Sequence, residues 1–289
     1  DASFSPFTRI KQRCNLLIVD EAHRSVAPTY KNAIELISNN GTKILGLTAT
    51  PGRTARNQIG SGNEELAQFY GNSKITIVGD DGEPLENPLK YLQEKRVLST
   101  YEVNFIEGSE QLELSDREAA DVSNLLDIPQ SVLNKLGADH VRTARVAAAI
   151  LEVAINRNLQ TIVFAPTKDN AIELALYLRF NECAAAAITG ETPSRDRARY
   201  IEEFRDEKIK VLTNFGVLTP GFDAPGTEAV IIARPTLSVV LYSQMVGRGL
   251  RGPRMGGTEV CLIIDVKDNI LNLPDIDEAF SYFDDFYGR

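Results

Sequence analysis

Two carboxylates and a histidine follow an apolar run near the start of the chain. The stretch LLIVDEAH places Asp20, Glu21 and His23 directly after four apolar residues. Such a run predicts a buried strand of a parallel sheet, and ligands bind open α/β sheets at the carboxyl edge of the strands. Mg²⁺ is held through one or two carboxylates plus substrate phosphates, and a carboxylate can deprotonate an attacking water. We therefore expect a Mg-nucleotide site at Asp20 and Glu21; a strand ending in solvated acids is the alternative.

A threonine-rich segment ends the next predicted strand, residues 43–47. Thr48 and Thr50 flank an alanine there and precede Pro-Gly. If the two strands are neighbours, these hydroxyls lie beside the first site, where a small hydroxyl can hydrogen-bond His23. The segment is thus a candidate for coupling the two strand ends, whereas an ordinary turn is the alternative.

A basic cluster lies far downstream, in SQMVGRGLRGPR. Gln244, Arg248 and Arg251 are spaced by four and then three residues, which places them on one stripe if residues 238–250 form a helix. The two glycines that flank Arg248 weaken such a helix, a cost that is understandable where another backbone or a ligand approaches closely. Two arginines on one face fit phosphate recognition; a solvated basic face is the alternative.

Two loops carry further polar residues at predicted strand ends. Gly221 and Asp223 lie in GFDAP, where the glycine lets backbone approach a nucleotide and the carboxylate can accept a ribose hydroxyl. Thr189 and Gly190 precede a helix that bears Arg195. Backbone amides, a hydroxyl and a cation at a helix start suit a nucleic-acid phosphate. A plain turn and a solvated helix face are the respective alternatives.

Strand and helix signals alternate through most of the chain, the pattern of parallel sheets with crossover helices. Before residue 105 we expect strands at 14–20, 43–47 and 74–78, and helices at 28–37, 64–70 and 88–95. Residues 106–139 are expected to be a linker or helical insertion. Beyond them we expect helices at 141–156, 169–180, 194–205 and 238–250, with strands at 161–165, 184–189, 209–213, 228–233 and 260–265. The predicted fold is α/β, with one parallel-sheet domain in residues 1–105 and another in residues 140–289.

Composition limits the class of protein. The 289 residues are 43% hydrophobic, enough for two folded cores. No apolar run approaches the ~20 residues that span a membrane, so we expect a cytoplasmic protein without a membrane partner. The net charge of −9 argues against a uniformly basic nucleic-acid-binding surface. The three scattered cysteines predict core residues rather than metal ligands or disulfides.

The order of these motifs resembles that of superfamily 2 helicases and translocases, in particular DNA-repair translocases and the motor subunits of type I restriction enzymes. VDEAH is similar to motif II, LTATPGR to motif III, IVFAPTKDNA to motif IV, VLTNFGVLTPGFDAP to motif V and SVVLYSQMVGRGLRGP to motif VI. The resemblance covers nearly the whole chain. It implies two RecA-like domains with ATP and Mg²⁺ bound between them.

The resemblance also implies roles for most of the candidate residues. Asp20 binds Mg²⁺ together with Glu21, the catalytic base, while His23, Thr48 and Gln244 couple the motifs. Arg248 and Arg251 are arginine fingers for the γ-phosphate. Gly221 and Asp223 face the nucleotide, and Thr189, Gly190 and Thr213 face the nucleic-acid backbone. Beside these implied roles, we expect Thr48 and Thr50 at the nucleotide and Arg195 at the nucleic acid.

The forms TATP and GRGLR resemble the DNA-directed branch of the superfamily. The expected partner is therefore duplex DNA, with RNA left open. A non-hydrolysing nucleic-acid-binding module is a rival from a different class. A second rival is the motor of a restriction or anti-phage enzyme, which implies a nuclease or methyltransferase partner.

One feature of the superfamily is missing. Its phosphate-binding loop ends in Gly-Lys-Ser/Thr and lies upstream of motif II, but no lysine of this chain follows a glycine. We therefore expect the first domain to be N-terminally truncated, and the chain alone to be inactive because its nucleotide affinity is poor.

Overall fold

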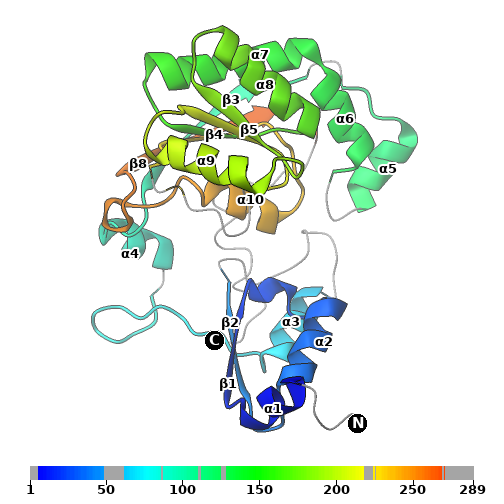
Figure 1. The fold of residues 1–289 in the computed structure, drawn as a ribbon, viewed down its shortest axis with the longest axis vertical. Helices are drawn as coiled ribbons and strands as arrows, with labels where there is room; N and C mark the ends of the chain where they lie inside the picture. The colour runs from blue at the N-terminus through cyan, green and yellow to red at the C-terminus, as the bar shows by residue number, and fades with distance from the viewer. Residues whose placement is uncertain are drawn as a thin grey trace. The chain divides into compact units, whose positions relative to one another are not determined.

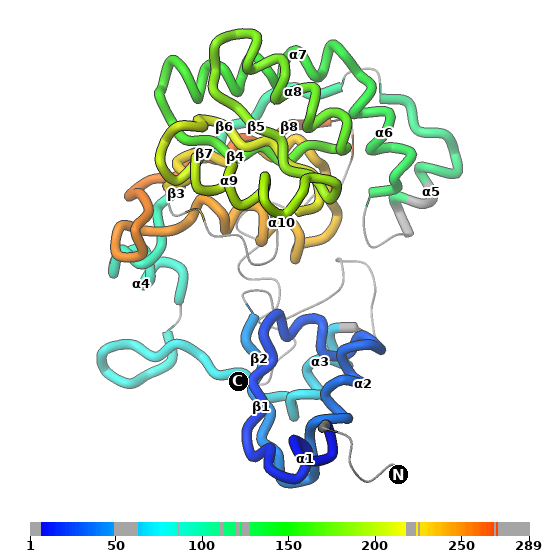
Figure 2. The backbone as a smooth tube through the Cα atoms, viewed as in Figure 1, coloured from blue at the N-terminus to red at the C-terminus, as the bar shows by residue number. Residues whose placement is uncertain are grey.

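The computed structural model describes residues 6–48, 62–85, 87–109, 112–124, 128–217, 224, 226–268 and 270. The chain divides into two compact units, with the division between Ile77 and Val78. Figures 1 and 2 trace the elements of each unit along the chain.

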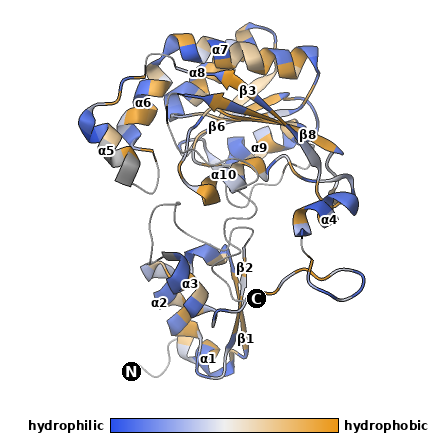
Figure 3. Ribbon diagram, turned by 180° about the vertical axis from the view of Figure 1, so that it is seen from behind, coloured by the Kyte–Doolittle hydropathy of each residue, from blue (hydrophilic) through white to orange (hydrophobic). Residues whose placement is uncertain are grey.

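The first unit is built on two parallel strands, β1 (Leu16–Asp20) and β2 (Lys43–Leu47), in a register that pairs Asp20 with Leu47. Its helices are α1 (Pro6–Arg13), the 3₁₀ turn η2 (Ala22–Arg24), α2 (Pro28–Ile37) and α3 (Gly62–Phe69). Figures 1 and 3 show the three α-helices on one side of the strand pair. The carboxyl ends of both strands therefore lie at one edge, as the sequence predicts.

Side chains of β1 alternate between the helices and the other face. Val19 is buried, whereas Leu16 and Ile18 are 56% and 54% exposed. The apolar run LLIV predicts a strand covered on both faces. Within the described residues only the helical face is covered.

The second unit contains a six-stranded, wholly parallel sheet in the order β3-β8-β7-β4-β6-β5. Its strands are β3 (Thr100–Glu107), β4 (Thr161–Phe164), β5 (Ala185–Ile188), β6 (Val211–Asn214), β7 (Ala229–Ile232) and β8 (Val260–Lys267). β4, β6 and β7 are buried at every position, which is typical of central parallel strands.

Helices lie on both faces of this sheet. The described α-helices of the second unit are α4 (Pro88–Glu94), α5 (Asp116–Asn124), α6 (Gln130–Ala138), α7 (His140–Leu151), α8 (Lys168–Phe180), α9 (Ser194–Arg205) and α10 (Val239–Val246). A short π-helix, η3 (Glu152–Asn156), extends α7, and a 3₁₀ turn, η4 (Pro253–Met255), precedes β8. Figure 1 shows α7 and α8 on one face and α9 and α10 on the other. The unit is therefore doubly wound, with its main apolar core under α7 and α8.

The boundary between the units differs from the prediction. β3 pairs with β8 along its whole length, yet most of β3 falls inside the expected first domain, which ended at residue 105. β3 is an edge strand with only alternating partial burial, so its apolar signal is weak. The expected strand at 74–78 is wrong, because the described pairing there is a single antiparallel bridge between Val78 and Pro84.

The segment expected to be a linker or helical insertion contains α5 and α6. Six buried apolar residues form a small core here: Leu112, Ile128, Val132, Leu133, Leu136 and Ile270. This core holds the two helices within the second unit. No helix in the described part of the chain has both the length and the apolar character needed to cross a lipid bilayer.

Candidate nucleotide and nucleic-acid site

A sharp turn at the carboxyl end of β1 presents the two acidic residues. Asp20 is exposed, and its Oδ1 accepts a hydrogen bond of 2.8 Å from the backbone N–H of Glu21. Glu21 has φ 51° and ψ 48°, a left-handed conformation that is costly for a residue with a Cβ. Such strained backbone concentrates at functional sites. The chain changes direction sharply at Glu21, directly after the end of β1, and both carboxylates lie at the edge of the sheet.

His23 connects this turn to the end of β2. Its Nδ1 lies 3.1 Å from Oγ1 of Thr48 and 3.4 Å from Oε2 of Glu21. The side chains of His23 and Glu21 are 14% and 30% exposed, so solvent reaches the carboxylate more readily than the ring. The expected contact between His23 and the threonine segment is present at Thr48, and Thr50 lies outside the described residues.

The donor set at this edge fits a magnesium ion held mainly by water and phosphate. Among the described residues, no group of three or more His, Cys, Asp and Glu side chains could enclose a metal. Mg²⁺ does not require such a cage, because it keeps several waters and uses one or two carboxylates. The exposed Asp20 carboxylate, with Glu21 next to it, meets that requirement.

Two residues that support this turn were not predicted. Ser25 is fully buried, and its hydroxyl lies 2.7 Å from the hydroxyl of Tyr70. Burial raises the pKa of the Tyr70 phenol. The Tyr70 ring packs against Gly46, where a Cβ would lie 2.6 Å from the ring Cζ. A glycine inside a strand often marks such a close approach, so Gly46 could have predicted that a bulky side chain packs against β2 at this position.

The helix expected to carry the arginines ends too early to do so. α10 begins after Ser238, whose Oγ accepts from Leu241 N at 3.2 Å, and ends at Val246. Gln244 lies on α10, but Arg248 and Arg251 follow it. The prediction of one helical stripe is therefore wrong for the two arginines, although they remain close in sequence within one loop.

Packing explains the glycine that follows Arg248. A Cβ on Gly249 would lie 2.3 Å from Sγ of Cys261 and 2.8 Å from Cγ2 of Val230. The close approach inferred from the sequence is thus made by buried residues of β7 and β8 rather than by a ligand. Arg251 is partly buried, and this burial lowers its pKa, with the positive charge of Arg205 as a second cause.

The loop after β5 is closed by its own hydrogen bonds. Thr189 N donates to Oγ1 of Thr192 at 2.9 Å, and Nη2 of Arg197 donates to Thr189 O at 3.2 Å. Thr189 is only 4% exposed. Gly190 and Arg195 are exposed, so they are the members of this predicted phosphate site that solvent reaches.

Thr213 lies at the contact between β6 and α8. It is fully buried in β6, and its hydroxyl donates a 2.6 Å hydrogen bond to the carbonyl of Ala171 in α8. The side chain therefore serves helix–sheet packing, and a role of Thr213 at the nucleic-acid backbone stays a prediction. Gly221 and Asp223 lie outside the described residues.

The fold and the position of these residues define a RecA-like class of α/β protein. A fragment described as an HsdR subunit of a type I restriction enzyme from Vibrio vulnificus has a TM-score of 0.56 and 19% identity, over 95% of this chain and 45% of the fragment. Saccharomyces cerevisiae Dbp5 L327V bound to RNA and ADP BeF3 has a TM-score of 0.51 and 18% identity, over 96% of this chain and 58% of Dbp5. At these identities the likeness establishes the fold.

Sequence comparison then identifies the family. Residues 6–53 match the family described as type III restriction enzyme, res subunit, and residues 144–252 match the helicase conserved C-terminal domain. A Schizosaccharomyces pombe protein described as the mitochondrial ATP-dependent helicase irc3 is 32% identical over 259 residues, which are 88% of this chain and 38% of that protein. Its Saccharomyces cerevisiae namesake IRC3 is 28% identical over 247 residues, or 82% and 32% of the two chains. The chain belongs to the superfamily 2 helicases, and it spans about a third of the length of these curated relatives.

Proposed function

We propose that the protein containing this chain is an ATP-dependent helicase or duplex-DNA translocase, in which ATP is hydrolysed between two RecA-like domains. The observation that carries the proposal is the turn after β1. It presents two carboxylates at a sheet edge and ties His23 to Thr48 of the neighbouring strand end at 3.1 Å. A strand that merely ended in solvated acids would not need a left-handed residue at this turn or a hydrogen bond between the two strand ends.

Each residue at this edge has a distinct task in the proposal. Glu21 orients the attacking water and takes its proton. His23 lies within reach of both Glu21 and Thr48, so it couples the position of the base to the end of β2. Mg²⁺, when bound at Asp20 and Glu21, would neutralise negative charge on the phosphates.

In the proposal, Gln244, Arg248 and Arg251 supply the polar groups that act on the nucleotide from the second RecA-like domain. The guanidinium groups stabilise the charge that develops on the transferred phosphoryl, the task of an arginine finger. Gly221 and Asp223 are assigned to the nucleotide. Exposed Gly190, in the loop after β5, and exposed Arg195, at the start of α9, are assigned to the nucleic-acid backbone.

The preference for duplex DNA is part of the proposal and rests on the TATP and GRGLR motifs. The helicase relatives include proteins described as RNA helicases. ATPase stimulation by duplex DNA should therefore be compared directly with stimulation by single-stranded DNA and by RNA of equal length. Stronger stimulation by RNA would reject the preference while leaving the motor intact.

Substitution of the general base tests the proposed function itself. In the protein encoded by the full reading frame, Glu21→Gln should lower nucleic-acid-stimulated ATP hydrolysis by at least about 10²-fold, the usual contribution of general base catalysis. ATP binding should remain, because the amide keeps the size of the side chain. The matched control is Glu35→Gln, at an exposed position of α2 in the same unit, which should hydrolyse ATP at the wild-type rate.

Two outcomes would change the assignment. Full activity in Glu21→Gln would remove the proposed base. A wild-type protein that binds nucleic acid but does not hydrolyse ATP would favour the non-hydrolysing binding module. The reading frame gives an earlier test, since a motor needs a Gly-Lys-Ser/Thr phosphate loop that is not in this sequence.

A second candidate is the motor of a restriction or anti-phage enzyme. The match of residues 6–53 to the res subunit of type III restriction enzymes favours it. A nuclease or methyltransferase domain in the same protein or complex would distinguish this candidate from a repair translocase.

A further inference from the structure

The loop that carries Arg251 is joined to a segment about 150 residues earlier in the chain. We call residues 250–259 the arginine loop and residues 96–100 the clasp. Four backbone hydrogen bonds connect them: Ser99 N to Leu250 O (3.1 Å), Gly252 N to Val97 O (2.9 Å), Arg254 N to Arg96 O (3.0 Å) and Thr100 N to Glu259 O (2.9 Å). Leu98 and Arg251 form an isolated antiparallel bridge. Both ends of the loop are therefore anchored to the clasp.

Ser99 lies at the centre of this connection. It is fully buried, and its hydroxyl is 2.7 Å from the carbonyl oxygens of both Arg251 and Thr258. Thr258 N also donates to Arg251 O at 3.0 Å. The two carbonyl oxygens share the single hydroxyl proton, so the hydroxyl bridges the two sides of the arginine loop where they approach each other. One of its acceptors is the backbone of the arginine itself.

Two glycines show how little space the loop has. A Cβ on Gly252 would lie 2.5 Å from the carbonyl oxygen of Arg96, and one on Gly257 would lie 1.9 Å from the carbonyl oxygen of Arg251. Both contacts are with backbone, which cannot give way as a flexible side chain does. The backbone of the arginine loop is thus tightly packed where it meets the clasp.

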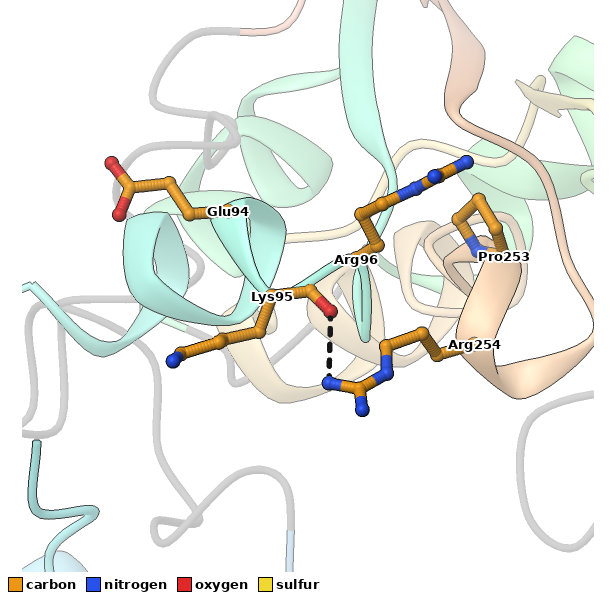
Figure 4. A pocket seen from close by; sticks show the side chains of 5 residues that line it. All are labelled: Glu94, Lys95, Arg96, Pro253 and Arg254. Atoms are coloured by element: carbon orange, nitrogen blue, oxygen red, sulfur yellow. Dashed lines mark hydrogen bonds between the residues drawn. The ribbon is translucent and has the colours of Figure 1, made fainter. Parts of the chain in front are cut away.

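The surface of the same junction is polar and exposed. Figure 4 shows the Arg254 guanidinium beside the carbonyl of Lys95, at an Nη1–O distance of 3.5 Å. Arg96 pairs with Glu259, and their side chains are 59% and 71% exposed. Exposed ion pairs contribute little to stability. The buried hydroxyl of Ser99 is therefore a side-chain contact that adds to the backbone hydrogen bonds in holding the backbone of Arg251.

We infer that Ser99 is a positioning residue for ATP hydrolysis, which acts by holding the backbone of Arg251 so that the guanidinium reaches the phosphates in the transition state. This inference rests on the proposed function. An arginine finger depends on geometry, and a displacement of about 1 Å can cost about 10²-fold in rate. Nothing in the motif sequences assigns Ser99 a role, since it lies outside all five.

The test is Ser99→Ala in the full-length protein, with ATP hydrolysis measured at saturating nucleic acid. We expect kcat to fall about tenfold, which corresponds to about 1.4 kcal/mol, while KM for ATP changes less than about twofold. The reason is that an arginine finger acts mainly in the transition state, so its misplacement lowers kcat rather than ground-state binding. Ser99→Cys keeps nearly the same side-chain size with a weaker donor and should give an intermediate kcat.

Ser109→Ala is the matched control for lost packing and lost hydrogen bonding. Ser109 is also a buried serine beside β3, and its hydroxyl donates to Oδ2 of Asp139 at 2.6 Å. It follows the carboxyl end of β3, whereas Ser99 precedes the amino end. Ser109→Ala should lower thermal stability by a similar amount but leave kcat unchanged.

A double variant separates positioning from general destabilisation. If Ser99 acts through Arg251, then Ser99→Ala combined with Arg251→Ala should be no slower than Arg251→Ala alone. Additive losses, or an unchanged kcat in Ser99→Ala, would overturn the inference and leave the proposed function standing. A wild-type protein without ATPase activity would overturn both.

Discussion

Neutralising Asp268 should destabilise the second unit more than any surface charge change. Asp268 follows β8 and pairs with Arg142 of α7; their side chains are 0% and 1% exposed. Arg142 donates to the two carboxylate oxygens through Nε at 2.7 Å and Nη2 at 2.8 Å, and Nη2 also donates to the carbonyl of Ala233 at 2.6 Å. Ser109 N donates to the same carboxylate at 2.9 Å. The pair thus joins α7 to the carboxyl ends of β3, β7 and β8.

The expected magnitude follows from burial. Removing one partner of a buried ion pair costs about 3–5 kcal/mol, because the remaining charge is left uncompensated in a medium of low dielectric. Asp268→Asn retains one oxygen that can accept from Arg142, so we expect a decrease of about 3 kcal/mol in the free energy of unfolding. Asp268→Ala removes both carboxylate acceptors, leaves only the carbonyl of Ala233 among the acceptors named above, and should reach the upper end of the range.

Urea unfolding followed by far-UV circular dichroism measures this change, since the chain has no tryptophan for fluorescence. Amide hydrogen exchange in β7 and β8 then assigns the change to the second unit. The matched control is Asp206→Asn. Its carboxylate lies 2.8 Å from Lys208, but the Lys208 and Asp206 side chains are 68% and 50% exposed, so the change should be below about 1 kcal/mol.

Equal effects of the two Asp→Asn substitutions would refute the reasoning, because the ion-pair distances nearly match and only burial differs. A further check replaces both buried partners. Arg142→Met with Asp268→Leu should be more stable than either single variant, since no uncompensated charge remains.

Two further predictions concern a titration and a packing contact. The Lys135 ammonium lowers the pKa of Glu118 to about 2 from 4.5. The contribution of the Glu118–Lys135 pair to the stability of the fold should therefore be complete above about pH 4.5 and be lost as the pH falls toward 2. A carboxyl-carbon NMR titration of Glu118 checks this, and a midpoint near 4.5 in the wild type would contradict it. Gly249→Ala should lower stability by about 1–3 kcal/mol through overpacking against Cys261. Gly190→Ala, where no atom lies within 4 Å of the added Cβ, should leave the melting temperature nearly unchanged, and equal shifts would reject the packing argument.

Local patterns were sufficient for much of the fold. The bounds of α9 and of β2 agree with the expectation, because the signals that start and stop such elements act within a few residues. The contact between His23 and Thr48 also follows from such patterns. Two apolar runs that end in polar residues place those residues at one edge once the strands pair in parallel, as β1 and β2 do.

What the sequence left out at the site has a physical origin in contacts between distant segments. The helix expected at 238–250 stops at Val246, and the turn that follows packs Gly249 against Cys261 and Val230. The hydroxyl of Thr213 is likewise bonded to a distant group, the carbonyl of Ala171 in α8, a contact that its motif does not indicate. Cys261, Val230 and Ala171 are all distant in sequence from the residues they contact, so no local pattern could predict these contacts.

The same reasoning explains why Ser99 escapes a motif-based interpretation. A motif marks residues that meet a ligand, because their types and spacing follow from the chemistry of that ligand. A residue that holds the backbone of a motif needs only a hydroxyl in the right place, and a single buried serine has no pattern of its own. Ser99 is identified by its two carbonyl partners, which are 152 and 159 residues away. We therefore expect a substitution outside the motifs to change kcat when it removes contacts that position Arg251, and the contacts of Ser99 lie at the amino end of β3.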